Sequence, residues 1–384
     1  MDVLNAAREL VPRIAAAGDE IERERRLPAA VVGAMAEAGI FRMLVPRSVG
    51  GGEVDIATFS RVVETIGAAD GSTAWCVSQG SVSATVAAFL APEVALEIFG
   101  QPSAIMAQGV AQRPRAIAAP RGYRVTGEWS FGSGCRHATW LNAGSPVYRE
   151  DGTPVTRPGG GQESRVMLFP AAQAEMRDTW HVSGLRGTGS DTYAVRDLFI
   201  PEERTVSHAR EGQRRELGPL YSFSTGLLFA TGFASVALGI GRGALDAFKG
   251  LASAKQPRAH ATLLRDNPIE QARVAQAEAA LRSARAFLHE SIAAAWETAA
   301  CGDEPTVEQK VLLRLAATSA IRRAGAVTDT VYHAAGATAV FESNPFERRF
   351  RDANAVTQQF QGSEVHFPAT GRFFLGLEPA AASF

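Results

Sequence analysis

The spacing of apolar residues divides the chain into a helical, a strand-rich and a second helical segment. Up to about residue 100, apolar side chains such as Leu4, Ala7 and Leu10 recur three and four positions apart, which predicts amphipathic helices. From about 103 to 205 the spacing is two, the period of a half-buried strand. Longer helical patterns return from about 215. The pattern predicts three domains, covering residues 1–102, 103–212 and 213–384.

The clearest strand signal is the segment GYRVTGEWSF at residues 122–131. Tyr123, Val125, Trp129 and Phe131 alternate with polar residues, so we expect them on one buried face. The insert EDGTPVTRPGGGQE at residues 150–163 is rich in turn residues and is predicted to be a mobile hairpin tip or a loop. Further strands are expected at residues 104–108, 116–120, 139–147, 165–169 and 193–200.

Helix start and stop signals in the last segment predict a four-helix bundle. Asn267 followed by Pro268 is a capping residue before a proline at the first helical position. Thr306 begins another helix that is expected to end at Gly336. The remaining two bundle helices are expected near residues 219–252 and 349–376.

The composition narrows the class of protein. The 384 residues carry 39 Lys and Arg against 40 Asp and Glu, a net charge of −1 that gives no support to a nucleic-acid or anionic-membrane partner. No run of 18 apolar residues and no signal-peptide pattern occurs, so we expect a cytoplasmic protein without a membrane span. Three distant cysteines and seven histidines without ligand spacing predict no metal site.

Two segments carry the candidate chemistry, WSFGSGC at 129–135 and DTWHVSGLRGTGS at 178–190. Both combine aromatic residues with glycines and hydroxyl side chains. Such segments suit a flat ring with polar edges, because aromatics pack against its faces and hydroxyls bond to its edge. On composition alone, the alternative is that Trp129 and Trp180 are sheet core and the glycines are turns.

At these segments the chain resembles the acyl-CoA dehydrogenase superfamily, and within it the flavin-dependent hydroxylases that receive reduced flavin from a partner reductase. The resemblance covers nearly the whole chain. Its motifs are LVPRSVGGGEVD (44–55), ADGSTAWC (69–76), GEWSFGSGCRHATW (127–140), DTWHVSGLRGTGSDTYAVRDLFIP (178–201) and ERRFRDA (347–353). It implies an α+β, mainly α fold, with an N-terminal helical domain, a central β domain and a C-terminal four-helix bundle. It also implies a homotetramer, with a homodimer as the alternative.

The resemblance assigns roles to individual residues. Ser133 is implied as the catalytic residue, with a hydroxyl that faces the reactive N5/C4a edge of the flavin. Arg258 matches an arginine that reaches the flavin phosphate, often across a subunit interface, with Arg265 as a competitor. The implied flavin-binding residues are Trp75, Phe131, Ser133, Gly134, Trp180, Arg186, Thr188, Ser190 and Arg258.

Three departures from the family pattern concern the substrate pocket. Gln361 stands where acyl-CoA dehydrogenases have a glutamate base, and an amide accepts no proton at neutral pH. Glu364 is a candidate replacement. Ser83 and Asn354 stand where phenol hydroxylases have histidines. We expect a Gln361→Glu change to bury an unpaired carboxyl rather than to restore dehydrogenation of an acyl-CoA ester.

The resemblance implies a flavin-dependent monooxygenase that uses reduced FMN or FAD and O₂ to oxygenate a small organic substrate. Its implied partner is a separate flavin reductase. Two alternatives stay open. One is a flavin dehydrogenase or oxidase with its base elsewhere, and the other is a non-catalytic protein with the flavin-binding fold.

Overall fold

The N-terminal segment folds into helices, as its apolar spacing predicts. A computed structural model describes residues 2–157, 159–207, 214–258 and 261–379. Asp70 caps one of these helices, because its Oδ1 accepts a hydrogen bond of 2.7 Å from the backbone N–H of Thr73. The helices are α1 Val3–Ala16, α2 Gly18–Glu24, α3 Ala29–Glu37, α4 Ile56–Ala69, α5 Gly71–Ala84 and α6 Pro92–Phe99.

The central segment forms one eight-stranded sheet with the order β6-β7-β3-β2-β4-β5-β8, in which β1 pairs with β4. β3 is antiparallel to both β2 and β7, whereas β1 and β4 run parallel. The strands are β1 Met106–Gln108, β2 Val110–Ala119, β3 Gly122–Gly132, β4 Trp140–Tyr148, β5 Ser164–Pro170, β6 Glu175–Arg177, β7 Asp191–Pro201 and β8 Thr205–Ser207. The predicted strands are present, but β2 begins six residues before its expected start, and β6 and β8 are additions.

The expectation that Phe131 shares the buried face of Trp129 is wrong. Trp129 is fully buried and stacks on Tyr193 at 5.6 Å between ring centroids. Phe131 is 58% exposed, because its φ of 56° places it in the left-handed region and the register to β7 shifts between Trp129 and Gly132. The irregularity turns the Phe131 side chain out of the sheet core.

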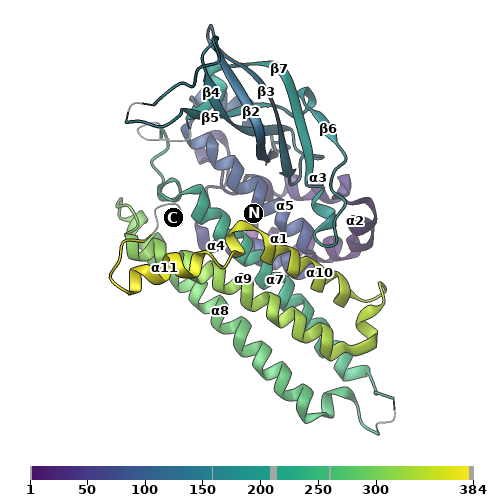
Figure 1. The fold of residues 1–384 in the computed structure, drawn as a ribbon. Coiled ribbons are helices and arrows are strands. Elements are labelled where there is room, and N and C mark those ends of the chain that lie inside the picture. The colour runs from purple at the N-terminus through teal and green to yellow at the C-terminus, as the bar shows by residue number, and fades with distance from the viewer. Residues whose placement is uncertain (1, 158, 208–213, 259–260, 380–384) are drawn as a thin grey trace.

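The C-terminal segment forms the bundle, with the sheet at one end of the molecule and α8 and α9 extending to the other (Figure 1). Asn267 and Thr306 cap α8 and α9 as predicted. The helices are α7 Thr225–Ala254, α8 Pro268–Ala300, α9 Val307–Ala335, α10 Pro345–Gln358 and α11 His366–Phe374. The three-domain division stays a prediction, although helices give way to strands after α6 and return with α7.

The single helix expected near 349–376 is wrong, because α10 and α11 are separate. Between them the chain turns at Phe360–Gly362, where the Gln359 side chain accepts a hydrogen bond from the backbone N–H of Gln361. A Cβ on Gly362 would lie 2.9 Å from Ile321, so this turn packs closely against α9. The break places Gln361 at the inner side of the bundle, where it is buried.

The central helix of the molecule is α7, which packs against α4, α5, α9 and α10. Among the described residues it is the one helix with the length and apolar composition to cross a membrane, and 83% of its most apolar window is buried inside the protein. Gly239 allows α7 to approach α4, because a Cβ there would lie 2.5 Å from the carbonyl oxygen of Glu64. These features are typical of a helix in a protein core.

Candidate active site

A cavity of about 550 Å³ lies where the sheet, α5, α7 and the turn after α10 meet. Its volume is typical of a site for a small molecule or cofactor. It gathers seven of the residues singled out from the sequence, which are Trp75, Phe131, Ser133, Trp180, Thr188, Ser190 and Gln361. We call this space the ring cavity.

Aromatic side chains form much of the wall of the ring cavity. Phe131 and Trp180 meet edge to face, with ring centroids 6.0 Å apart. Trp75 of α5 stacks on Phe233 of α7, with ring centroids 4.0 Å apart. The remaining lining residues include Gln79, Gln108, Val110 and Phe229. This wall suits a flat aromatic ligand.

A line of buried hydrogen bonds runs along the sheet side of the ring cavity. The Trp75 Nε1–H donates to Ser133 Oγ at 2.9 Å, and the Oγ atoms of Ser133 and Ser190 lie 2.7 Å apart. Ser190 Oγ lies 2.6 Å from Thr188 Oγ1, which donates to the carbonyl oxygen of Leu185 at 2.8 Å. We call these five residues the hydroxyl network. They come from three separate segments of the sequence.

The Leu185 peptide connects this network to the helical bundle. Its N–H donates to Asp352 Oδ1 of α10 at 2.6 Å, and its carbonyl also accepts a bond of 3.0 Å from Trp180 Nε1. Leu185 has a φ of 52°, so these bonds hold a left-handed backbone conformation in place. Burial, with the nearby Asp70 carboxylate as second cause, raises the pKa of Asp352 to about 7.

On the bundle side, the amide of Gln361 lines the ring cavity and is bonded to a buried arginine. Arg314 of α9 is 2% exposed, and its guanidinium donates to Gln361 Oε1 and to the carbonyl oxygen of Gly226. Burial lowers the pKa of Arg314 to about 10, so the side chain stays cationic at neutral pH.

This arrangement corrects two expectations about the base position. A Gln361→Glu carboxylate would meet the Arg314 guanidinium, so it would be paired rather than unpaired. Glu364 lies outside the lining of the ring cavity, where its exposed carboxylate pairs with Arg322 at 3.7 Å. Glu364 therefore does not replace the missing base in this structure.

Other residues predicted for the site lie outside the ring cavity. Gly134 and Arg186 border the loop that carries Thr188, with the Gly134 N–H donating to the Thr188 carbonyl oxygen at 2.9 Å. Asn354 is exposed and donates to the Phe350 carbonyl oxygen, and Arg258 is exposed after the end of α7. Their proposed contacts with flavin or substrate stay predictions.

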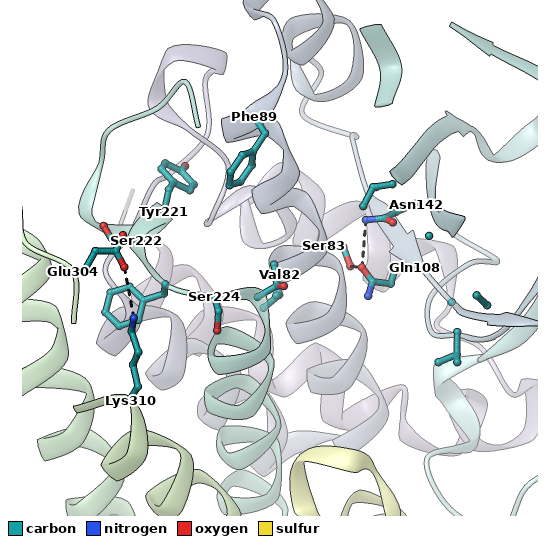
Figure 2. Close-up of a pocket in the computed structure, with 17 residues that line it drawn as sticks. Val82, Ser83, Phe89, Gln108, Asn142, Tyr221, Ser222, Ser224, Glu304 and Lys310 are labelled. Atoms are coloured by element: carbon teal, nitrogen blue, oxygen red, sulfur yellow. Dashed lines mark hydrogen bonds and ion pairs between the residues drawn. The ribbon is translucent and has the colours of Figure 1, made fainter. Parts of the chain in front are cut away.

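A second cavity of about 700 Å³ adjoins the first, because Gln108 and Val110 line both. Figure 2 shows the residues that line this second cavity. Ser83, predicted for the substrate pocket, lies here. Its Oγ donates to Gln108 Oε1 at 3.4 Å, and Asn142 Nδ2 donates to the same oxygen at 3.3 Å. We call this space the side cavity.

Sequence reasoning missed Gln108 and Asn142, since both lie in strands where polar residues alternate with apolar ones as a matter of course. Five further lining residues that the sequence did not indicate lie in the turn before α7 and at the start of this helix, where no motif marks them. They are Tyr221, Ser222, Phe223, Ser224 and Thr225.

The comparison with protein families agrees with this architecture. The N-terminal domain of acyl-CoA dehydrogenases matches residues 2–95, and their C-terminal domain matches residues 231–363. The chain belongs to the acyl-CoA dehydrogenase superfamily, and the expected fold class is confirmed.

Individual relatives narrow the class further. The chain is 36% identical to the indole-3-acetate monooxygenase of Pseudomonas putida, over 94% of this chain and 90% of the relative. It is 31% identical to the oxygenase subunit HsaA, a flavin-dependent monooxygenase of Mycobacterium tuberculosis, over 92% of this chain and 90% of the relative. The structure of XiaF from Streptomyces sp. in complex with FADH₂ and glycerol matches with a TM-score of 0.91 and 28% identity. The match covers 100% of this chain and 97% of XiaF. The protein is a flavin-dependent monooxygenase that uses a reduced flavin.

Proposed function

We propose that the ring cavity holds the ring system of the reduced flavin and that the side cavity receives a planar aromatic substrate. The observation that carries the proposal is the convergence of aromatic side chains and buried hydroxyls from α5, the sheet and the turn after α10 on one cavity. Flat aromatic walls and a hydroxyl edge are the features that a flavin ring requires. The residues present therefore fit the cofactor.

The bound reduced flavin supplies the electrons with which O₂ is activated. The protein's own contribution is to position and enclose the reactants. Trp180 and Phe131 would pack against the ring, and Ser133 would bond to its polar edge as the proposed catalytic residue. Phe229 and Phe233 would exclude water on the bundle side.

Monooxygenation is favoured over dehydrogenation by the chemistry of the cavity wall. Removal of an α-proton from an acyl thioester requires a base, and the Gln361 amide is no base at neutral pH. Its oxygen accepts a hydrogen bond from Arg314. The described residues that line the ring cavity include no Asp, Glu or His. The dehydrogenase alternative would have to draw its base from elsewhere.

The proposed substrate class follows from the side cavity. Phe89, Tyr221 and Phe223 give it aromatic walls. The Gln108 and Asn142 amides line the side away from Tyr221 and from the ion pair of Glu304 with Lys310 (Figure 2). This lining suits a planar aromatic compound with a polar substituent. The Pseudomonas putida relative acts on indole-3-acetate, an aromatic of this kind.

We also propose the partners and the assembly. The oxygenase-subunit name of the mycobacterial relative supports a separate flavin reductase, and we propose a cytoplasmic location. Large apolar side chains around α11 are exposed in the single chain, which supports a homotetramer, with a homodimer as the alternative. They are Phe360, Val365, Phe367, Phe374 and Leu375. In such an assembly Arg258 could reach the flavin of a neighbouring subunit.

The test mixes the protein without oxygen with FMNH₂ or FADH₂, and then adds O₂ together with a panel of aromatic acids. We expect a reduced flavin to bind and ¹⁸O from ¹⁸O₂ to enter one product. Reduction of bound oxidised flavin by a substrate would favour the dehydrogenase alternative. Failure to bind either flavin would favour a non-catalytic protein. Light scattering near 41 kDa at micromolar concentration would contradict the proposed assembly.

A further inference from the structure

The hydroxyl network has a direction that its two ends impose. The indole N–H of Trp75 has one proton and no acceptor orbital, so it can only donate. The carbonyl oxygen of Leu185 has no proton, so it can only accept. Between these ends lie Ser133, Ser190 and Thr188, each with one hydroxyl proton to place.

The protons can be assigned one by one from the Leu185 end. Thr188 places its proton on the Leu185 carbonyl oxygen, so the bond of 2.6 Å between Thr188 and Ser190 requires Ser190 to donate. Ser190 has then used its proton, so the bond of 2.7 Å between Ser190 and Ser133 requires Ser133 to donate. Ser133 is left with no proton for a ligand. Since Trp75 occupies one lone pair, one acceptor position remains.

The surroundings keep this direction in place. Ser133, Ser190 and Thr188 are 6%, 3% and 1% exposed, so solvent offers them few alternative partners. None of these hydroxyls titrates near neutral pH. Asp352 bonds to the Leu185 N–H and not to its carbonyl, so protonation of Asp352 leaves that carbonyl an acceptor.

We propose that the hydroxyl network makes Ser133 an acceptor-only group toward the ring cavity and thereby selects reduced over oxidised flavin. The inference rests on the proposed function, in which Ser133 bonds to the polar edge of the flavin, and on the sequence resemblance, which implies that this edge is the one with N5. Reduced flavin carries a hydrogen on N5 and can donate to Ser133. Oxidised flavin has a bare nitrogen there, so two acceptors would face each other and one bond would be lost.

This reasoning identifies Ser190 and Thr188 as specificity-determining residues that act through Ser133. In a Ser190→Ala variant Ser133 no longer donates within the network, and its proton is free to turn toward the cavity. Thr188→Val keeps the side-chain shape and removes the acceptor of the Ser190 proton. Ser190 can then donate to Ser133, so the direction of that hydrogen bond can reverse and the Ser133 proton can turn toward the cavity. Both variants should therefore improve the binding of oxidised flavin relative to reduced flavin.

The measurement is the ratio of dissociation constants for oxidised and reduced flavin, with FMN and FAD titrated separately under anaerobic conditions. We expect the parent to bind the reduced form more tightly. In Ser190→Ala and Thr188→Val the dissociation constant for oxidised flavin, divided by that for reduced flavin, should fall by about two- to thirteenfold, the equivalent of one hydrogen bond. Ser133→Ala should weaken the binding of the reduced form and leave that of the oxidised form nearly unchanged.

A matched control removes a serine pair elsewhere. Ser60 of α4 and Ser235 of α7 are buried and bonded at 2.7 Å, and neither lines the ring cavity. Ser60→Ala should leave the ratio at the parent value. An unchanged ratio in both Ser190→Ala and Thr188→Val, with flavin still bound, would overturn the inference. A parent protein that binds neither redox state would instead contradict the proposed function.

Discussion

The two sides of the ring cavity offer different chemistry. The sheet side presents Ser133, Thr188 and Ser190, which are neutral, buried and bonded to one another. The bundle side presents Gln361, whose amide is bonded to the buried cation of Arg314. Among the described residues that line the cavity, neither side has an Asp, Glu or His to accept a proton at neutral pH. The cavity is therefore suited to hold and shield a cofactor rather than to remove a proton from a substrate.

The difference also concerns what a substitution would disturb. On the sheet side each hydrogen bond joins neutral groups, which typically contribute about 0.5–1.5 kcal/mol each. On the bundle side a charged group is buried, and its loss of an acceptor costs more than the loss of a neutral bond. Substitutions on the bundle side should therefore affect stability, and those on the sheet side should affect flavin binding.

The largest expected effect is on the bundle side. Gln361→Leu removes an acceptor from the buried Arg314 guanidinium and should lower the free energy of unfolding by about 1–3 kcal/mol or more. Gln361→Glu should be tolerated better, because its carboxylate meets the same guanidinium. Urea denaturation of both variants measures the difference. A Leu variant as stable as the parent would show that Arg314 does not depend on this bond.

The Glu variant also tests the identity of the reaction. We expect acyl-CoA esters to leave the flavin bound to Gln361→Glu oxidised, because the proposed substrate is a planar aromatic compound and not a CoA ester. Bleaching of the flavin by any acyl-CoA ester would contradict this. It would show that the bundle side has lost its base but retained the substrate site of the dehydrogenases.

An intermediate effect is expected on the sheet side. Trp180→Ala removes the aromatic partner of Phe131 and the bond to the Leu185 carbonyl. The dissociation constant of the reduced flavin should rise on the order of tenfold. Trp180→Phe keeps the ring and loses the Nε1 bond, so it separates the two contributions. Unaltered flavin titrations with Trp180→Ala would place the ring elsewhere.

The last expected effect is a pH dependence of stability through Asp352, which joins the two sides through Leu185. Its pKa is raised from 3.8 to about 7, so the folded protein binds more protons than the unfolded chain between these pH values. The free energy of unfolding should therefore fall as the pH rises from about 4 to 7. Other charged groups interact with Asp352, and they are Glu22, Asp70, Arg349 and Arg351.

Asp352→Asn tests this pH dependence. The amide oxygen can still accept from the Leu185 N–H, but it does not ionise. The melting temperature of the parent should fall by a few degrees more than that of the variant between pH 5 and pH 8, because 1 kcal/mol corresponds to about 1 °C in a chain of 384 residues. Parallel curves would mean that Asp352 keeps the same charge in the folded and unfolded protein across this range.

Much of the secondary structure could be read from the sequence, because its signals act over a few residues. Helices are capped by Asp70, Asn267 and Thr306, whose side chains accept hydrogen bonds from backbone N–H groups two or three positions later. The period of two located the strands for the same reason. The motif resemblance extended this reading to the fold and to the residues that line the ring cavity.

The errors arose where distant parts of the chain decide the local conformation. Phe131 continues the strand period, yet the shifted pairing with β7 turns it outward. The helix expected near 349–376 breaks at a turn that packs against α9. The contacts with β7 and with α9 cannot be identified from the residues adjacent to Phe131 or to the turn in the sequence.

By itself the sequence determined which side chains are available, and the tertiary structure decided which of them meet. Ser133, Thr188 and Ser190 are ordinary loop residues until folding brings Trp75 to one end of them and Leu185 to the other. Gln361 is an absent base in the sequence, and the structure shows it bonded to Arg314, 47 positions away. Hydrogen-bond direction and burial depend on all the groups around an atom, and in this protein those groups come from helices and strands far apart in the chain.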